Sequence, residues 1–410
     1  MTMREDANAI ITAALHAANP DTAVRKALQD LPEVKGRIFL TAIGKAAWQM
    51  SDAAAGYLGS RLDKGICITK YGHVMGTIPN VTCFEAGHPV TDDNSVQATA
   101  AAIRLAENLQ ADDLLVFLVS GGGSALFEAP AIPLGELQDI TRQMLSCGAD
   151  IVEMNTIRKR LSLVKGGKFA RLASPARVFA VILSDIIGDP LDMIASGPAC
   201  ADHTTCADAL AIVRKYRLQL SEQALACLQE ETPKELGNVE TRITGSVRQL
   251  CAAAEETSRR LGYEPHFLTA SLNCEARDAG RFLAAIGQDH CHEGKALAYI
   301  CGGETVVHVH GKGLGGRNQE LALAAAEGIA GLDSVLLFSL GSDGTDGPTD
   351  AAGGIVDGNT AGALHDMGIS IPDVLADNDA YHALQNVDGL ITTGPTGTNV
   401  NDLTVLLIRQ

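Results

Sequence analysis

The sequence predicts a doubly wound α/β fold in two domains, the first larger than the second. Three observations lead to this prediction. Short, fully apolar runs alternate with longer helical stretches, glycine-rich turns follow several of the runs, and a polar segment without a strong strand separates two such regions. Apolar strands separated by helices are typical of parallel sheets that are covered on both faces.

The elements follow from this alternation in chain order. The expected strands are 37–43, 65–69, 113–119, 178–183, 265–269, 296–300, 305–309, 334–339 and 403–408. The expected helices include 46–58, 96–109, 134–147, 247–261, 277–286 and 318–329. The polar, mainly helical segment 215–244 marks the boundary, so we expect one domain over residues 1–240 and a second over 241–410, with a cleft between them.

Composition limits the possible partners. The 410 residues include 32 Lys and Arg against 49 Asp and Glu, a formal net charge of −17. Without a basic surplus to displace counterions, we expect neither nucleic acid nor an anionic membrane as a partner. No apolar stretch approaches the ~18 residues needed to span a bilayer, and the ten cysteines contain no C-x-x-C pair. We therefore expect a cytoplasmic protein with free thiols.

The sharpest motif is the loop Ser120-Gly121-Gly122-Gly123-Ser124, which follows an apolar strand. Glycines permit positive φ angles and close backbone approach, so that successive N–H groups can point at a phosphate. A tight turn would need a single glycine. Three in a row favour an anion site.

The first strand leads to a similar turn, Gly44-Lys45, at the start of a helix. A cation in the first turn of a helix opposes the helix dipole, so Lys45 is expected to contact an anionic ligand. An exposed, solvated lysine is the alternative.

Two aspartates, Asp185 and Asp189, follow the apolar run 178–183. Carboxylates at the carboxyl end of a strand near a phosphate loop typically hold Mg²⁺. An N-cap followed by a turn aspartate is the alternative.

A basic stretch in this acidic protein runs from residue 155 to residue 168. Asn155, Arg158, Ser162 and Lys165 recur at three- and four-residue spacing and would share one face of a helix. We interpret this face as a candidate binding surface. A solvated basic face is the alternative.

The second half contains a literal G-x-G-x-x-G at Gly311, Gly313 and Gly316, between an expected strand and an expected helix. This pattern is typical of dinucleotide sites. The acidic residue expected about 20 positions later at the end of the next strand is missing. Arg317 at the helix start is better interpreted as a clamp for a carboxylate or phosphate.

Two polar loops complete the set of candidates. The loop 341–350 contains Asp343 and two further aspartates, which suggests a metal or hydroxyl-binding site without full EF-hand spacing. The loop 392–402 is rich in glycine, threonine and asparagine. His290-Cys291-His292-Glu293 lacks the spacing of a structural zinc site, and no Walker A motif is present.

In this order the loops resemble those of the class II glycerate 2-kinases, whose C-terminal part is called the MOFRL domain. The motifs that carry the resemblance are Gly44-Lys45-Ala46, Gly87-His88-Pro89, 120–124, 155–158, 165–167, 184–189, 196–198, 302–304, 315–320, 342–349 and 393–399. The resemblance covers nearly the whole chain. It implies a Rossmann-like N-terminal domain, an active site between the domains, and phosphorylation of the 2-hydroxyl of D-glycerate with ATP and Mg²⁺ as cofactors.

The logic of phosphoryl transfer suggests a role for each candidate. Lys45 and Arg317, from opposite domains, would neutralise the transferring phosphoryl group and the substrate carboxylate, and Asp189 or Asp343 would position the hydroxyl. The remaining expected roles are phosphate binding by Ser120, Gly121, Gly122, Gly123, Ser124 and Lys165, substrate binding by Asn155 and Arg158, and metal binding by Asp185 and Asp189.

Two other functions stay open on the sequence. The first is an NAD(P)H-dependent hydroxypyruvate reductase, which would rest on the segment 311–316. The second is a sugar-acid sensor without turnover. The sequence does not give the oligomeric state, for which a homodimer is a reasonable expectation.

Overall fold

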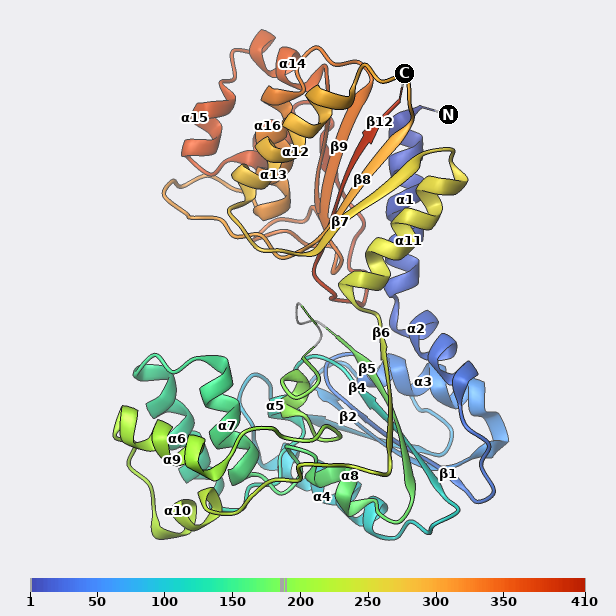
Figure 1. The fold of residues 1–410 in the computed structure, drawn as a ribbon, viewed down its shortest axis with the longest axis vertical. Helices are drawn as coiled ribbons and strands as arrows, with labels where there is room; N and C mark the ends of the chain where they lie inside the picture. Colours follow the sequence, from blue (N-terminus) through green and yellow to red (C-terminus); the bar gives the residue numbers. More distant parts are fainter. Residues whose placement is uncertain (1, 185–187, 189, 410) are drawn as a thin grey trace. The chain divides into compact units, whose positions relative to one another are not determined.

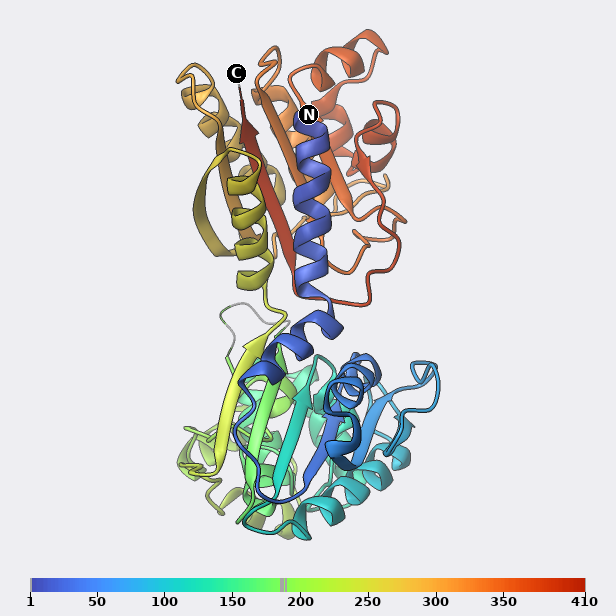
Figure 2. The ribbon, with the colours of Figure 1, turned by 90° about the vertical axis from the view of Figure 1, so that its right-hand side faces the viewer.

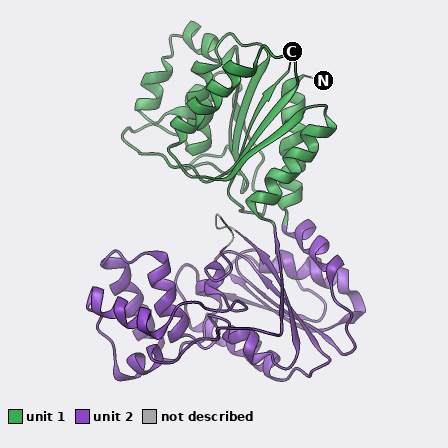
Figure 3. Cartoon of the chain, viewed as in Figure 1, with its two compact units in different colours: residues 1–19, 185–188, 245–410 green, residues 20–184, 189–244 purple. Residues whose placement is uncertain are grey.

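The structure is a computed structural model that describes residues 2–184, 188 and 190–409. The chain divides into two compact units (Figure 3). Residues 20–184 and 189–244 belong to one, which we call the first unit, and residues 1–19, 185–188 and 245–410 belong to the other, the second unit. Each unit is built on its own six-stranded sheet.

The sheet of the first unit has the strand order β3-β2-β1-β4-β5-β6, and every neighbouring pair is parallel. The strands are β1 (Ile38–Ile43), β2 (Leu62–Lys70), β3 (Val81–Ala86), β4 (Leu114–Val119), β5 (Arg177–Leu183) and β6 (Val239–Thr244). Both β1 and β4 are buried along their whole length. This is the order of doubly wound α/β domains, in which the chain changes direction across the sheet between β1 and β4.

Helices cover both faces of this sheet (Figure 1). On one face lie α2 (Pro20–Ala27) and α3 (Ala47–Leu58), and on the other lie α4 (Asp93–Glu107), the short α5 (Gly123–Leu126) and α8 (Lys168–Leu172). A separate cluster of α6 (Leu134–Ser146), α7 (Ile151–Leu161), α9 (Cys206–Tyr216) and α10 (Glu222–Leu228) has its own apolar core.

The sheet of the second unit is mixed, with the order β11-β10-β9-β12-β8-β7. The strands are β7 (Glu264–Leu272), β8 (Leu297–Gly303), β9 (Val335–Gly341), β10 (Gly353–Asp357), β11 (Leu390–Ile391) and β12 (Asp402–Ile408). While β7 and β8 are parallel, β12 lies antiparallel between β8 and β9. The expectation of purely parallel sheets is therefore wrong for this unit, since an apolar run does not reveal the direction of its strand.

The mixed sheet is also covered on both faces (Figures 1 and 2). On one face α1 (Met3–Ala18) and α11 (Val247–Arg260) lie side by side. The other face carries α12 (Ala276–His290), α13 (Arg317–Gly328), α14 (Thr360–Asp366), α15 (Ile371–Ala376) and α16 (Ala380–Gln385). Among the helices of the described residues, none is long and apolar enough to cross a bilayer.

Some expected strands differ from the observed ones. The segment 305–309 forms no strand beyond a bridge between Val306 and Glu275. Val306 and Val309 are exposed, and Val307 is partly buried. Conversely, the structure contains β3 and β6, which the sequence pattern did not predict. Polar residues interrupt the apolar pattern of both strands, and much of each strand is incompletely buried.

Helix α1 packs with the second unit, although the sequence placed it in the first domain. Its buried Asp6 carboxylate accepts a hydrogen bond from the Tyr263 hydroxyl at 2.8 Å and one from the Arg409 guanidinium at 2.6 Å. Arg409 also lies over the Tyr263 ring at 4.0 Å. Helix α1 is thus joined to the residue that follows β12 by an ion pair whose carboxylate is buried.

Replacing Asp6 should destabilise the second unit. In an Asp6→Asn variant, Arg409 loses its charged partner, and we expect the free energy of unfolding to fall by about 2–3 kcal/mol. Urea unfolding followed by circular dichroism measures this change. Asp366→Asn is the control, since that carboxylate is 88% exposed. Equal stability of the two variants would contradict the anchoring role of Asp6.

Candidate functional site

The candidate site of the first unit lies where β1 and β4 end. These neighbouring strands are parallel, so their carboxyl ends meet at one edge of the sheet. They flank the point at which the strand order reverses, where ligands of open α/β sheets usually bind. The turn after β1 carries Lys45, and the turn after β4 is the glycine loop, residues 120–124.

Ser120 fastens these two turns together. Its buried hydroxyl accepts a hydrogen bond from the Ala46 amide at 3.1 Å and donates one to the Ile43 carbonyl at 3.2 Å. The Lys45 amide donates to the Gly121 carbonyl at 2.8 Å. Gly44, with a φ of 112°, approaches Ser120 so closely that a Cβ atom on Gly44 would lie 2.3 Å from the Ser120 hydroxyl oxygen. The hydroxyl of Ser120 therefore holds the loops in place and is not directed at a ligand.

The rest of the glycine loop presents unused donors. The amide N–H groups of Gly121, Gly122, Gly123 and Ser124 donate no hydrogen bond to any described residue. Unpaired successive amides are costly unless water or an anion accepts their hydrogen bonds. The loop therefore has the chemistry of an anion site.

Lys45 and His88 flank the middle of this loop. A Cβ atom built on Gly122, whose φ is 84°, would lie 3.1 Å from both the Lys45 stem and the His88 imidazole. Burial lowers the pKa of His88, and the charges of Lys45 and Lys70 lower it further. Both effects favour the neutral form of His88, so the positive charge beside the loop comes mainly from the lysines.

A chain of side-chain contacts supports the far end of the loop. The Ser124 and Ser196 hydroxyls are 3.0 Å apart, and the Ser196 hydroxyl donates to the Asn155 amide oxygen at 2.9 Å. Asn155 and Ser196 are both buried. Asn155, expected to bind substrate, therefore positions Ser196 and Ser124 in this structure.

Lys165 binds the backbone of the segment from Ser124 to Phe127. Its buried ammonium donates to the carbonyl oxygens of Ser124 and Phe127 at 2.9 and 2.7 Å, and it lies 3.2 Å from a carboxylate oxygen of Glu128. Burial lowers the pKa of Lys165, and Glu128 opposes that shift. With its three N–H donors used, Lys165 has no capacity left for a phosphate, which differs from the expected role.

Arg158 faces a cavity of about 430 Å³. The cavity is lined by the 88–91 loop, by Gly122 and Ser124, by one face of α6 and by Arg158 of α7. Burial lowers the pKa of the Arg158 guanidinium, which makes no hydrogen bond or ion pair with a described residue. Glu128 also lines this cavity, and its buried Oε1 has no partner within the described chain. The Glu128 charge opposes the effect of burial on Arg158. A partly buried guanidinium without a hydrogen-bonded partner suits an anionic ligand.

In the second unit Arg317 lies in a cluster of acids. Its guanidinium binds Asp402 in bidentate fashion, at 2.6 and 2.9 Å, and donates to Glu304 at 2.7 Å. Burial raises the pKa of Asp402 to about 6, although Arg317 opposes the shift. Glu304 is half-exposed, whereas Asp402 is buried.

The G-x-G-x-x-G segment is packed against the protein's own backbone. A Cβ atom on Gly311 would lie 2.1 Å from the Asp377 carbonyl, and one on Gly313 would lie 2.4 Å from the Asp379 side chain. The amides of Lys312 and Leu314 donate to these same two aspartate side chains. Glycine is therefore required at these positions because segment 377–379 packs directly against the loop, which leaves no room there for a pyrophosphate.

The other acidic candidates have separate places. Asp346 accepts from the Asn318 and Gln319 amides and so caps α13, whereas Asp343 is partly exposed and accepts from the Thr345 amide and hydroxyl. The expected metal ligands Asp185 and Asp189 lie outside the described residues. Within the described ranges no group of three or more His, Cys, Asp or Glu could hold a metal ion.

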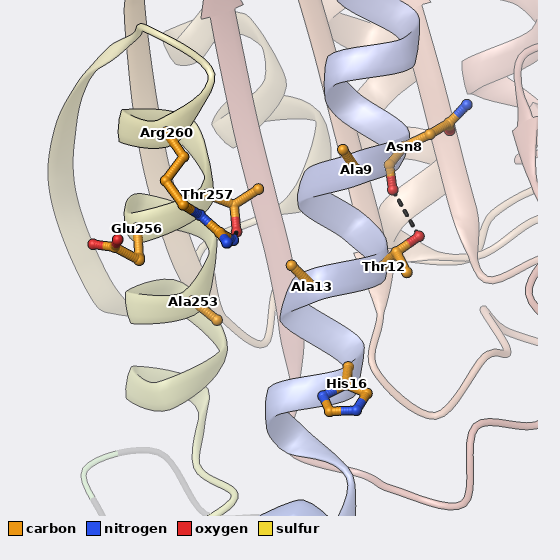
Figure 4. A pocket seen from close by; sticks show the side chains of 9 residues that line it. All are labelled: Asn8, Ala9, Thr12, Ala13, His16, Ala253, Glu256, Thr257 and Arg260. Carbon is orange, nitrogen blue, oxygen red and sulfur yellow. Dashed lines mark hydrogen bonds between the residues drawn. The ribbon is translucent and has the colours of Figure 1, made fainter.

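A second and larger hollow, about 710 Å³, lies in the second unit (Figure 4). It runs between α1 and α11 and is lined partly by alanines, including Ala9, Ala13 and Ala253. The Thr12 hydroxyl donates to the Asn8 carbonyl of its own helix, and Arg260 donates to Thr257. None of the sequence motifs reaches this groove, so it is not the candidate site.

Comparisons with known proteins agree with the sequence resemblance. Residues 6–229 match a family described as a domain of unknown function (DUF4147), and residues 297–402 match the MOFRL family. The chain is 48% identical over 405 residues to D-glycerate 2-kinase from Thermotoga maritima, covering 97% of each protein. It is 39% identical to glycerate 2-kinase from Pyrococcus horikoshii, covering 100% of this chain and 98% of that one.

Solved structures and other relatives extend the comparison. The crystal structure of glycerate kinase from T. maritima superposes with a TM-score of 0.94 at 48% identity, over 99% of each chain. A protein from Agrobacterium vitis named putative hydroxypyruvate reductase is 37% identical, over 100% of this chain and 95% of that one.

The structure adds three residues to the site that sequence reasoning did not assign to it, His88, Glu128 and Ser196. Two of them lie in short motifs that carried the resemblance, at 87–89 and 196–198. The signal for Glu128 was weaker, a single acid in the otherwise apolar segment 125–132.

The pKa of His88 should report on the charge of Lys45. In a Lys45→Met variant we expect this pKa to rise towards its ordinary value, because one of the cations that oppose protonation is gone. Titration of the imidazole by NMR measures the shift. Lys64→Met serves as control, since Lys64 lies near the opposite end of β2 from the site. An unchanged His88 titration in Lys45→Met would contradict the proximity of the two groups.

Proposed function

The chain belongs to the glycerate 2-kinase family, and we propose from that premise that it phosphorylates D-glycerate on the 2-hydroxyl with ATP, giving 2-phosphoglycerate and ADP. The observation that carries this proposal is the 48% identity to the T. maritima enzyme over 97% of both chains. An identity of this size over the full length of both domains supports a shared reaction.

The groups of the first unit suit the phosphates of ATP. In phosphoryl transfer, catalysis depends mainly on positioning and on neutralising the charge of the transferring group. The free amides of Gly121 to Ser124 would bind phosphate oxygens. Lys45 and Arg158 supply positive charge, while Ser120, Asn155 and Lys165 keep the loop in position.

In the second unit, Arg317 is our candidate for the substrate carboxylate. Asp402 fixes one edge of its guanidinium, and the half-exposed Glu304 holds the other. We propose that the carboxylate of glycerate exchanges with Glu304 at that edge, because this ion pair is the more solvated of the two. Asp343, which is partly exposed, remains our candidate for orienting the hydroxyl, with Asp189 as the other.

Magnesium stays a proposal that rests on Asp185 and Asp189. When bound, it would neutralise phosphate charge. The acids near Arg317 do not fit a metal, because Arg317 and Asn401 already occupy oxygens of Glu304 and Asp402. Since the enzyme uses ATP, we also propose that it works in the cytoplasm. A homodimer remains a prediction.

The two other functions find less support. The reductase rested on the glycines at 311–316, which pack against segment 377–379. A sensor without turnover would not need the free amides and cations that surround the glycine loop. The name hydroxypyruvate reductase occurs among the relatives, but at lower identity than the name D-glycerate 2-kinase.

A coupled assay tests the reaction and its regiochemistry together. Purified protein, ATP, Mg²⁺ and D-glycerate are combined with enolase and pyruvate kinase but without phosphoglycerate mutase. We expect pyruvate to form, since enolase accepts 2-phosphoglycerate and not the 3-phosphate. ADP release without pyruvate would contradict the 2-position, and the absence of both products would contradict the kinase.

Loss of either cation should lower turnover. For Lys45→Met and Arg317→Gln we expect kcat to fall about 10²–10³-fold, the usual effect of removing one group that stabilises transition-state charge. Lys64→Met and Arg281→Gln are matched controls on exposed surface. Thermal unfolding of each variant separates lost catalysis from lost fold. Near wild-type kcat in a folded Lys45→Met or Arg317→Gln would remove that residue from the mechanism.

A further inference from the structure

One face of α6 forms a wall of the 430 Å³ cavity in the first unit. Leu134, Leu137, Gln138, Thr141 and Leu145 recur at three- and four-residue spacing and all line it. The buried side of the same helix, with Ile140 and Met144, packs into the core of the helical cluster. Helix α6 thus presents a second, partly apolar face to the cavity.

Two large apolar side chains at this cavity are unusually exposed. Leu145 and Val90 each have 61% of their surface exposed. A single exposed leucine or valine is common on a protein surface, but two that line one cavity point to a ligand that covers them. Pro89 and Ala125 add to the apolar lining.

The same cavity also has polar groups that suit an anion. Gly122 and Ser124, whose amides donate no hydrogen bond within the described residues, line it together with Arg158. Glu128 lines it too and acts on Arg158 by its charge, but its carboxylate is already paired with Lys165. A ligand that fills the cavity therefore needs both an apolar surface and negative charge. Its volume lies within the range of about 300–1,000 Å³ that is usual for small-molecule sites.

We propose that this cavity is the nucleotide site, with the adenine ring against Leu145 and Val90 and the phosphates at Gly122 and Arg158. The proposal rests on the proposed function, which makes ATP a substrate. A nucleotide has the required combination of a flat apolar ring and a multiply charged tail.

Gln138 gives the site a preference among bases. Its amide nitrogen donates to the Thr91 carbonyl at 2.9 Å, which fixes the orientation of the amide group. The amide oxygen has no hydrogen-bond partner among the described residues and remains an acceptor. This acceptor matches the exocyclic amine of adenine, whereas the carbonyl oxygen at C6 of hypoxanthine or guanine would face it as a second acceptor.

Binding of ADP tests the apolar wall without requiring turnover. Calorimetry with Mg²⁺ and no glycerate compares wild type, Leu145→Gln and the control Met367→Gln, which replaces an apolar side chain of similar exposure at the end of α14. We expect Leu145→Gln to raise the Kd of ADP about 3–10-fold, through lost apolar contact, and to leave the Kd of inorganic tripolyphosphate unchanged. Met367→Gln should change neither Kd.

The outcomes separate this inference from the function on which it rests. Equal ADP affinity in Leu145→Gln and wild type, with turnover of glycerate intact, overturns the base site and leaves the kinase standing. If wild type binds no ADP and forms no product, both fail. An equal loss of ADP and tripolyphosphate affinity in Leu145→Gln overturns the proposal too, because the residue would then act through the phosphates.

The base preference has its own test. We expect wild type to bind ADP at least about 5-fold more tightly than inosine diphosphate, and Gln138→Leu to bring the two Kd values within about 2-fold of each other. A preference that persists in Gln138→Leu would show that Gln138 does not read the base.

Discussion

The hydrogen bonds of the Ser120 hydroxyl set the geometry on which the anion site depends. This one buried group joins the turns after β1 and β4 by accepting from Ala46 and donating to Ile43. The backbone bonds from the Ser120 amide to the Ile43 carbonyl and from the Lys45 amide to the Gly121 carbonyl join the same two turns. The four amides that begin at Gly121 take no part in these contacts and donate no hydrogen bond within the described residues.

The positive charges of the first unit fall into two kinds. Lys165 is fully enclosed and paired with Glu128, so that its charge is cancelled where it stands. Among the described residues, Lys45 and Arg158 form no ion pair, although the Glu128 charge also acts on Arg158. Burial of a charge costs free energy unless it is compensated, which is the reason that Arg158 is a candidate for binding an anion.

Much of the fold follows from the apolar pattern, but less of the site does. The runs that form β1 and β4 were predictable because they are apolar, apart from Thr41 in β1. The antiparallel direction of β12 leaves no trace in periodicity. Residue type located the glycine loop correctly as a feature at the sheet edge. It could not distinguish Ser120 from Ser124, or Lys165 from a ligand-binding lysine, because their partners come from distant parts of the sequence. The glycines at 311–316 gave a misleading signal for the same reason, since residues 377–379 occupy the space they leave.

The packing of α1 with the second unit affects how the protein folds during synthesis. This helix precedes both sheets in the chain, yet its apolar side, with Ile10 and Ile11, is covered by elements that are synthesised after residue 245. The partner of Asp6 is Arg409, near the end of the chain. The nascent chain therefore carries this amphipathic helix without its packing partners until the second unit has been synthesised. A fragment that begins after residue 19 would have to fold the second unit without it.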